Sequence, residues 1–219
     1  MKLKTLALAV AFLGAGPAFA DSVNLTNFAF PPAKPVTVST PSYSGSAGQF
    51  TGTLNGNSFS TFCTDLFQTF SFNTTYTDYS IVNGVTAWGA AKSLAMDQLM
   101  SAIVQSGWPT DAAQSAWAQA AVWEVLYETS GSYGFNTGTF QATSTDSGVQ
   151  GYLTSNNNWA SLPSYTVTVH VDQLYSREHQ DFLVVTEVPA VPEPETYALM
   201  LAGLLAVGAT ARRRAGRGA

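Results

Sequence analysis

Short runs of alternating apolar and polar residues dominate the first part of the chain and predict β-strands. Two of these runs flank Asn55-Gly56, a dipeptide that is typical of a two-residue hairpin turn. The strands are predicted at residues 49–54, 58–63, 66–72, 76–82, 165–171 and 182–188. Residues 23–41 are polar and rich in proline, so we expect an extended lead-in with one edge strand at residues 36–38.

Two helices are predicted between the fourth and fifth of these strands. The first covers residues 88–105, where apolar side chains recur at intervals of three and four, and a glycine and a proline end it. The second can be capped by Thr110 or Asp111 and runs to about residue 129. Residues 130–158 are rich in Gly, Ser, Thr and Asn, and we expect them to form a long loop.

The order of strands, two helices and strands indicates the α+β class. We expect an antiparallel, β-rich domain, either a sandwich or barrel-like, with a two-helix insertion. This domain is assigned to residues 21–188, a length sufficient for one domain with its own core.

The first twenty residues have the three parts of a secretory signal peptide. Lys2 and Lys4 give a positive start, an uncharged apolar run follows, and Ala18-Phe19-Ala20 is a small-x-small cleavage signal. The alternative, a membrane anchor, is disfavoured because a span needs about 20 apolar residues. We therefore predict cleavage after Ala20 and an extracytoplasmic body.

The charge of this body excludes two classes of partner. Between Asp21 and Ala190 the chain holds twelve acidic side chains and three basic ones. Nucleic-acid binding needs a basic surface, and anionic lipid attracts clustered Lys and Arg. We therefore expect neither nucleic acid nor an anionic lipid surface as a partner of the body.

Cys63 is the only cysteine of the chain. Exported proteins usually carry cysteines in disulfide pairs, so a single thiol needs another explanation. It can be a small buried apolar residue, it can pair between molecules, or it can be bonded to something other than sulfur.

A candidate partner for the cysteine lies in the second predicted helix. Gln119 falls on one helix face with Val122, Trp123 and Leu126, which are all large and apolar. An unpaired amide on a buried face is costly, so Gln119 must be hydrogen-bonded or chemically consumed. Attack of a Cys63 thiolate on this amide would expel ammonia and leave an intramolecular thioester.

Two motifs around these residues resemble the thioester domains of bacterial surface adhesins. The first is Phe62-Cys63-Thr64-Asp65, and the second is Ala118-Gln119-Ala120-Ala121-Val122-Trp123, with Ala118 where the family usually has Thr. The resemblance covers about residues 50–127. It implies a Cys63–Gln119 bond with Phe62, Asp65 and Trp123 around it, which an amine or hydroxyl of a partner can attack at the Gln119 acyl carbon.

The C-terminal residues 189–219 form a separate three-part segment. Val191-Pro192-Glu193-Pro194-Glu195 precedes an apolar run of about 14 residues, which as a helix rises roughly 21 Å against a hydrocarbon core of about 30 Å. Arg212, Arg213 and Arg214 follow and are expected to stay cytoplasmic. The alternative is an ordinary tail anchor.

This segment resembles the PEP-CTERM sorting signal, whose motif matches Pro192, Glu193 and Pro194. The resemblance implies a Gram-negative bacterium, recognition by an exosortase in the inner membrane, and delivery to the cell surface or an exopolysaccharide matrix. It also implies a hydrophobic sorting helix and a cytoplasmic arginine tail.

Two function hypotheses follow, and neither is an enzyme. No hydrolase elbow, Walker loop, dinucleotide fingerprint or zinc-protease motif occurs in the sequence, and no metal or cofactor is expected. The first hypothesis is a surface protein whose thioester serves covalent adhesion or matrix cross-linking. The second is a non-covalent, polysaccharide-binding matrix protein in which Cys63 is simply buried.

Overall fold

The computed structural model describes residues 20–107, 109–131, 133–155, 166–188 and 200. Most of the predicted signal peptide lies outside these residues. So does the predicted C-terminal signal apart from Met200, including Pro192, Glu193, Pro194 and the arginines Arg212, Arg213 and Arg214.

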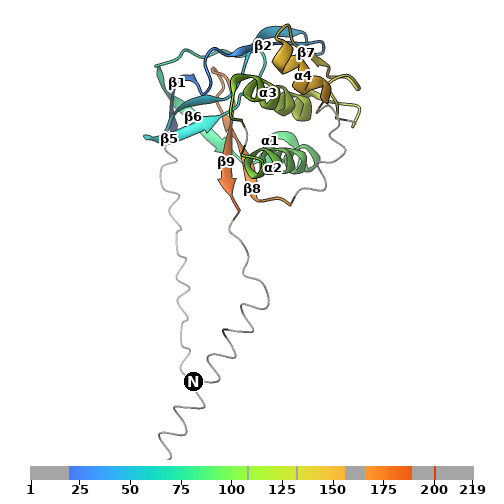
Figure 1. Cartoon of the computed structure of the whole chain (residues 1–219). Coiled ribbons are helices and arrows are strands. Elements are labelled where there is room, and N and C mark those ends of the chain that lie inside the picture. Colours follow the sequence, from blue (N-terminus) through green and yellow to red (C-terminus); the bar gives the residue numbers. More distant parts are fainter. Residues whose placement is uncertain (1–19, 108, 132, 156–165, 189–199, 201–219) are drawn as a thin grey trace, which may run out of the picture.

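Six antiparallel strands form the main sheet in the order β5-β4-β1-β6-β8-β9. Figure 1 shows them on one side of the molecule and the helices on the other. Their bounds are β1 Asp21–Phe28, β4 Phe50–Leu54, β5 Asn57–Thr61, β6 Thr75–Val82, β8 Val169–Tyr175 and β9 Phe182–Glu187.

The two outer strands of this sheet meet, which makes it nearly barrel-like. Cys63, just beyond β5, forms an isolated bridge with Phe182 at the start of β9. The Leu183 N–H donates to the Phe62 carbonyl at 3.0 Å, and the Thr61 hydroxyl donates to the Leu183 carbonyl at 2.7 Å. We call residues 61–64 and 181–183 the closing seam, and it satisfies backbone groups that an open edge would leave unpaired.

A smaller sheet has the order β3-β2-β7, with bounds β3 Tyr43–Ala47, β2 Lys34–Val38 and β7 Ala142–Thr143. The strand predicted at residues 36–38 is therefore present, but it is the central strand and not an edge. It pairs on one side with β3 and on the other with β7, which comes from the region predicted to be loop.

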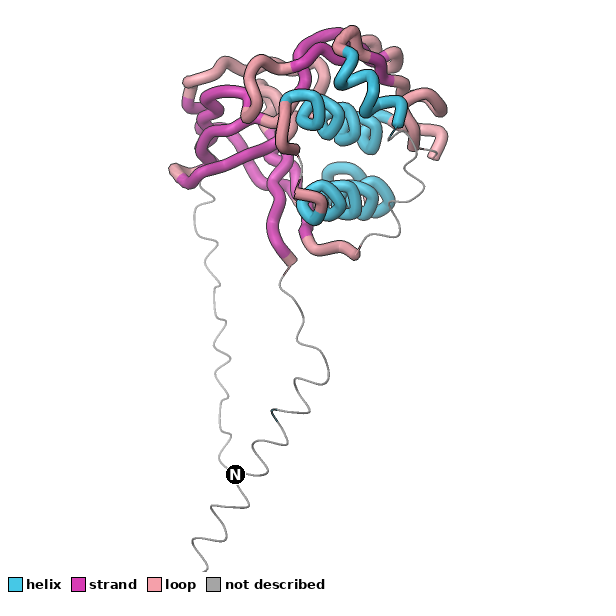
Figure 2. The backbone as a smooth tube through the Cα atoms, in the orientation of Figure 1, coloured by secondary structure: helices cyan, strands magenta, loops and turns pink. Residues whose placement is uncertain are grey.

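Four helices cover the sheets: α1 Gly84–Trp88, α2 Ala90–Gln105, α3 Ala112–Tyr127 and α4 Ser147–Ser155. Helices α2 and α3 lie side by side (Figure 2), and α3 also packs against α4, β2 and β3. Asp111 caps α3 by accepting the Ala113 and Gln114 N–H groups at 2.8 Å. Every residue of α3 from 114 to 125 is buried, because its many alanines let neighbouring elements approach closely.

Several predicted elements are confirmed. The hairpin of β4 and β5 turns at Asn55 and Gly56, which have φ values of 52° and 80°. The strands β6 and β9 lie close to their predicted positions, and β8 lies a few residues later than predicted. The two predicted helices correspond to α2 and α3.

Other predictions are wrong. Residues 66–72 form no strand, because Asp65 turns the chain and the rings of Phe70 and Phe72 pack instead in an aromatic cluster with Phe50. The predicted lead-in contains β1, a central strand of the main sheet. The predicted loop at residues 130–158 contains β7 and α4, so the described part of the domain has four helices and not a two-helix insertion.

Candidate functional site

Cys63 lies in the closing seam, where the chain leaves β5. Its neighbours on both sides are fixed to β9 and to the residue before it: the Phe62 carbonyl accepts from the Leu183 N–H, and the Thr64 N–H donates to the Asp181 carbonyl at 2.9 Å. The Cys63 residue is 3% exposed. These hydrogen bonds hold residues 62–64 in a fixed position on the sheet.

Gln119 of α3 packs against Cys63. Its Oε1 accepts a hydrogen bond from the Cys63 N–H at 2.9 Å, and its Nε2 donates to the Cys63 carbonyl at 2.8 Å. The Gln119 side chain is fully buried. The structure thus brings together the two residues that the sequence singled out, with the amide aligned along the backbone of the cysteine.

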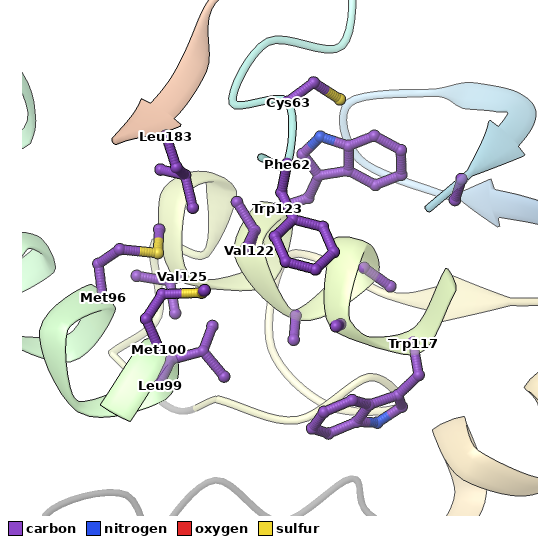
Figure 3. Close-up of a cluster of buried hydrophobic side chains, with 14 of the residues drawn as sticks. Phe62, Cys63, Met96, Leu99, Met100, Trp117, Val122, Trp123, Val125 and Leu183 are labelled. Atoms are coloured by element: carbon purple, nitrogen blue, oxygen red, sulfur yellow. The ribbon is translucent and has the colours of Figure 1, made fainter. Parts of the chain in front are cut away.

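One face of α3 contacts the segment 63–66 along its length. Gln119, Trp123 and Tyr127 are spaced four residues apart and so lie on this face. Figure 3 shows the Trp123 indole beside Cys63 and Phe62. The Tyr127 hydroxyl accepts a hydrogen bond from the Leu66 N–H at 3.2 Å. The helix and the segment therefore have a fixed register, with Gln119 opposite Cys63.

The surroundings of the thiol are dry and disfavour its charged form. Burial raises the pKa of the Cys63 thiol; the Trp123 indole opposes this shift, and the nearby Asp65 carboxylate adds to it. The Trp123 Nε1 is buried and has no hydrogen-bond partner among the described residues. The indole N–H is thus available to the sulfur, and the free thiol is protonated at neutral pH.

The three other residues predicted to surround the thioester fall into two groups. Phe62 and Trp123 are each 1% exposed and form part of the apolar wall. Asp65 caps a turn: its Oδ1 accepts from the Phe67 and Gln68 N–H groups at 2.5 and 2.8 Å. The role of Asp65 in the geometry is therefore to bend the chain directly after the seam.

A pocket of about 360 Å³ opens beside the seam, and sequence reasoning did not find it. Its walls come from five places in the chain: Thr64 and Asp65, Trp88 and Lys92, Tyr127, Gln173, and Asp181. Burial, with a contribution from Asp65, raises the pKa of the Asp181 carboxyl to about 6. Asp181 and Thr64 are far apart in sequence, so no local pattern joins them.

The described part of the chain contains no group of three or more His, Cys, Asp and Glu side chains arranged to hold a metal ion. Over the same residues, no helix combines the length and the apolar character that a membrane span requires.

Comparison with known families identifies the C-terminal segment. A family model described as the PEP-CTERM protein-sorting motif matches residues 190–214. The match includes Pro192, Glu193 and Pro194 and the arginines Arg212, Arg213 and Arg214. No match was found among curated proteins or among solved structures.

The chain therefore carries a PEP-CTERM sorting motif. This motif supports processing by an exosortase, and with it an exported protein that is anchored transiently in the membrane before release to the surface. The match begins after the body and carries no information on the chemistry of residues 21–188.

Proposed function

We propose that the protein is an exosortase-sorted surface or matrix protein of a Gram-negative bacterium, and that its body forms an internal thioester between Cys63 and Gln119. The observation that carries the proposal is the pairing of the Gln119 amide with the Cys63 backbone, at 2.9 and 2.8 Å, inside a buried wall. The bond would serve covalent adhesion or cross-linking to a partner that bears an amine or a hydroxyl.

The chemistry of bond formation balances within the two residues. The Cys63 sulfur attacks the Gln119 Cδ, the Cδ–Nε2 bond breaks, and the thiol proton leaves with the amide nitrogen as ammonia. The Cys63 N–H donates to Oε1, the atom on which negative charge develops during attack, and so acts as an oxyanion donor. The hydrogen bond from Nε2 to the Cys63 carbonyl fixes the orientation of the amide.

Burial of the site supports a long-lived thioester. Gln119 is 0% exposed and Cys63 is 3% exposed, so water has little access to the acyl carbon. The raised pKa of the thiol works against attack before the bond forms, because the thiolate is the nucleophile. The Trp123 indole N–H favours the thiolate and reduces that barrier.

Labelling with methylamine tests this proposal. The amine should open the thioester and leave a methylamide on Gln119, located by fragmentation of the digested protein. Gln114, a buried glutamine of the same helix, is the internal control and should stay unlabelled. Cys63→Ala should abolish the label, and a Gln119 that remains unlabelled in the parent chain would argue against the bond.

A second candidate function rests on a different surface. A groove of about 460 Å³ crosses β1, β4 and β5 and is lined by hydroxyl side chains around one aromatic ring: Thr26, Thr51, Thr53, Ser58, Ser60 and Phe59. Hydroxyl and aromatic groups are suited to sugars, so the groove favours non-covalent polysaccharide binding. In that case the Gln119 amide would only form hydrogen bonds with the N–H and the carbonyl of Cys63.

A further inference from the structure

The imidazole of His170, on β8, lies between two carboxylates. Its Nδ1 is 3.2 Å from the Oδ2 of Asp97 on α2, and its Nε2 is 3.0 Å from the Oδ1 of Asp172 on the same strand. A neutral imidazole carries one N–H and can donate to only one of these oxygens, whereas the imidazolium donates to both. The arrangement therefore fits the protonated ring.

Each of the two carboxylates is also bonded to the backbone. Asp97 Oδ1 accepts the Val171 N–H at 2.8 Å, which joins α2 to β8. Asp172 Oδ1 accepts the N–H of Gly84, the first residue of α1, at 3.0 Å. Figure 1 shows α1 and α2 beside β8, and both helices pack against this strand. The ring of His170 thus connects α2 to the start of α1 by way of β8.

Asn83 gives the neutral ring a second arrangement. It is the N-cap of α1, where its Oδ1 accepts the Val85 N–H at 3.1 Å, and its Nδ2 lies 3.2 Å from His170 Nε2. An unprotonated Nε2 can accept a hydrogen bond from this Nδ2, but it then presents a lone pair to the Asp172 oxygen. Loss of the proton therefore replaces an ion pair by a repulsion at the start of α1.

The charged groups that face the ring are both acidic. Asp97 faces it from α2 and Asp172 from β8, while the cross-strand partner on β9, Thr186, and Asn83 before α1 are uncharged. The hydrogen bond with Asp97, opposed by burial and reinforced by the Asp172 charge, raises the pKa of His170 above 6.5. The His170 side chain is 38% exposed, so the ring can exchange its proton with solvent.

We propose that His170 is a pH-sensitive clamp, whose protonated ring holds α2 and the start of α1 together on β8 and whose deprotonation loosens α1. The folded chain binds this proton more tightly than the unfolded chain, because only the fold places both carboxylates at the ring. The stabilisation is therefore complete below pH 6.5 and is lost as pH rises through the higher pKa of the folded state.

The clamp goes beyond the proposed function and does not depend on the thioester, because none of its residues belongs to the closing seam. Its effect can still reach the pocket beside that seam. Ala87 and Trp88 of α1 form part of the pocket wall, so a looser α1 would alter the wall.

Two-dimensional NMR of the purified full-length processed chain measures the titration of the ring. The Cε1–H signal of His170 is assigned with His170→Gln, and His179, the other histidine of the chain, gives the second signal. Asp97→Asn and Asp172→Asn each remove one charge and keep the shape of the side chain. Glu178→Gln, which changes an exposed carboxylate beyond the end of β8, is the control.

We expect His170 in the parent chain to titrate with a midpoint above pH 6.5. Each of the two Asn variants should lower this midpoint by about 0.5 pH unit, as expected for a partly exposed ion pair. Glu178→Gln should leave it unchanged. An unchanged midpoint in both Asn variants would overturn the clamp, and if one of them fails to fold, the other decides.

Amide hydrogen exchange tests the loosening of α1. The Ala87 N–H, which donates to the Asn83 carbonyl at 2.9 Å, reports on this helix. Amides of β4, which β1 and β6 separate from β8, report on global opening. Relative to β4 and corrected for intrinsic rates, protection of Ala87 should fall about threefold from about pH 5 to about pH 8 in the parent chain. It should stay constant in His170→Gln.

The two measurements address separate parts of the proposal. A midpoint that shifts in the Asn variants, together with equal Ala87 protection at both pH values in the parent chain, would overturn the loosening of α1. An equal loss of protection in the parent chain and in His170→Gln would do the same. Neither measurement requires a bond between Cys63 and Gln119, so failure of this proposal is distinguishable from failure of the proposed function.

Discussion

The side-chain amide of Gln119 pairs with the main chain of Cys63 as a neighbouring strand would, through Oε1 to the N–H and Nε2 to the carbonyl. Both hydrogen bonds involve the backbone of Cys63, so replacing the cysteine side chain leaves them in place. The structural and the chemical roles of this pair can therefore be separated by mutation.

The structural role predicts a difference between two variants that both lack the thiol. Relative to Cys63→Ala, the double variant Cys63→Ala/Gln119→Ala leaves a buried N–H and a buried carbonyl unpaired, at about 1–3 kcal/mol each. We expect its free energy of unfolding in urea to be lower by at least about 2 kcal/mol. Cys63→Ala/Gln114→Ala controls for truncating a glutamine of the same helix. Equal stability of the single and Gln119 double variants would refute the pairing.

The buried side chain of Glu124 should make the stability of the fold depend on pH. It is fully buried, its Oε1 accepts from the Gly134 N–H at 2.6 Å, and burial raises its pKa from 4.5 to about 8. Between these values the folded state holds a proton that the unfolded state has released. Stability from this group is therefore present below pH 4.5 and is lost as pH rises through about 8.

The measurement compares urea unfolding of Cys63→Ala and Cys63→Ala/Glu124→Gln at pH 5 and pH 8. Glutamine retains an oxygen for Gly134 but does not titrate, so the double variant should lose less stability on going to pH 8. The cysteine substitution removes any thioester hydrolysis from the comparison. A parallel decline in both proteins would show that Glu124 is not protonated in the fold.

The elements that sequence predicts well are those with local signals. Asn55-Gly56 adopts the positive φ values that the hairpin needs, and the Asp111 side chain caps α3 at its first turn. Both features depend on residues close in the chain, which is why the pattern alone suffices. Cys63 and Gln119 are 56 positions apart, and they were paired because each stands in a short motif that resembles the same family.

The elements that the sequence did not predict depend on contacts between residues far apart in the chain. Residues 66–72 alternate as a strand does, yet the rings of Phe70 and Phe72 pack against other aromatic rings, and the backbone has no partner strand among the described residues. Helix α4 buries only Val149 and Leu153, too few apolar positions for a periodic signal. The pocket joins Thr64 to Asp181 across the closing seam, a contact that exists only once the sheet has closed.

The sorting motif predicts a change in location. Deleting residues 192–194 removes the core of the matched segment, so the chain should accumulate in the membrane fraction and not reach the surface. Deleting residues 215–217, which lie beyond the match, is a control of equal length. Fractionation and surface labelling measure the outcome. Unchanged surface delivery of the 192–194 deletion would refute a sorting role.

The intact mass of the purified, untreated chain tests the thioester most directly. With both termini established by sequencing, we predict a mass below that of the sequence by one ammonia. Cys63→Ala and Gln119→Ala should each restore the mass calculated from their sequence. The full calculated mass in the parent chain, together with a Cys63 thiol that titrates on unfolding, would contradict the thioester.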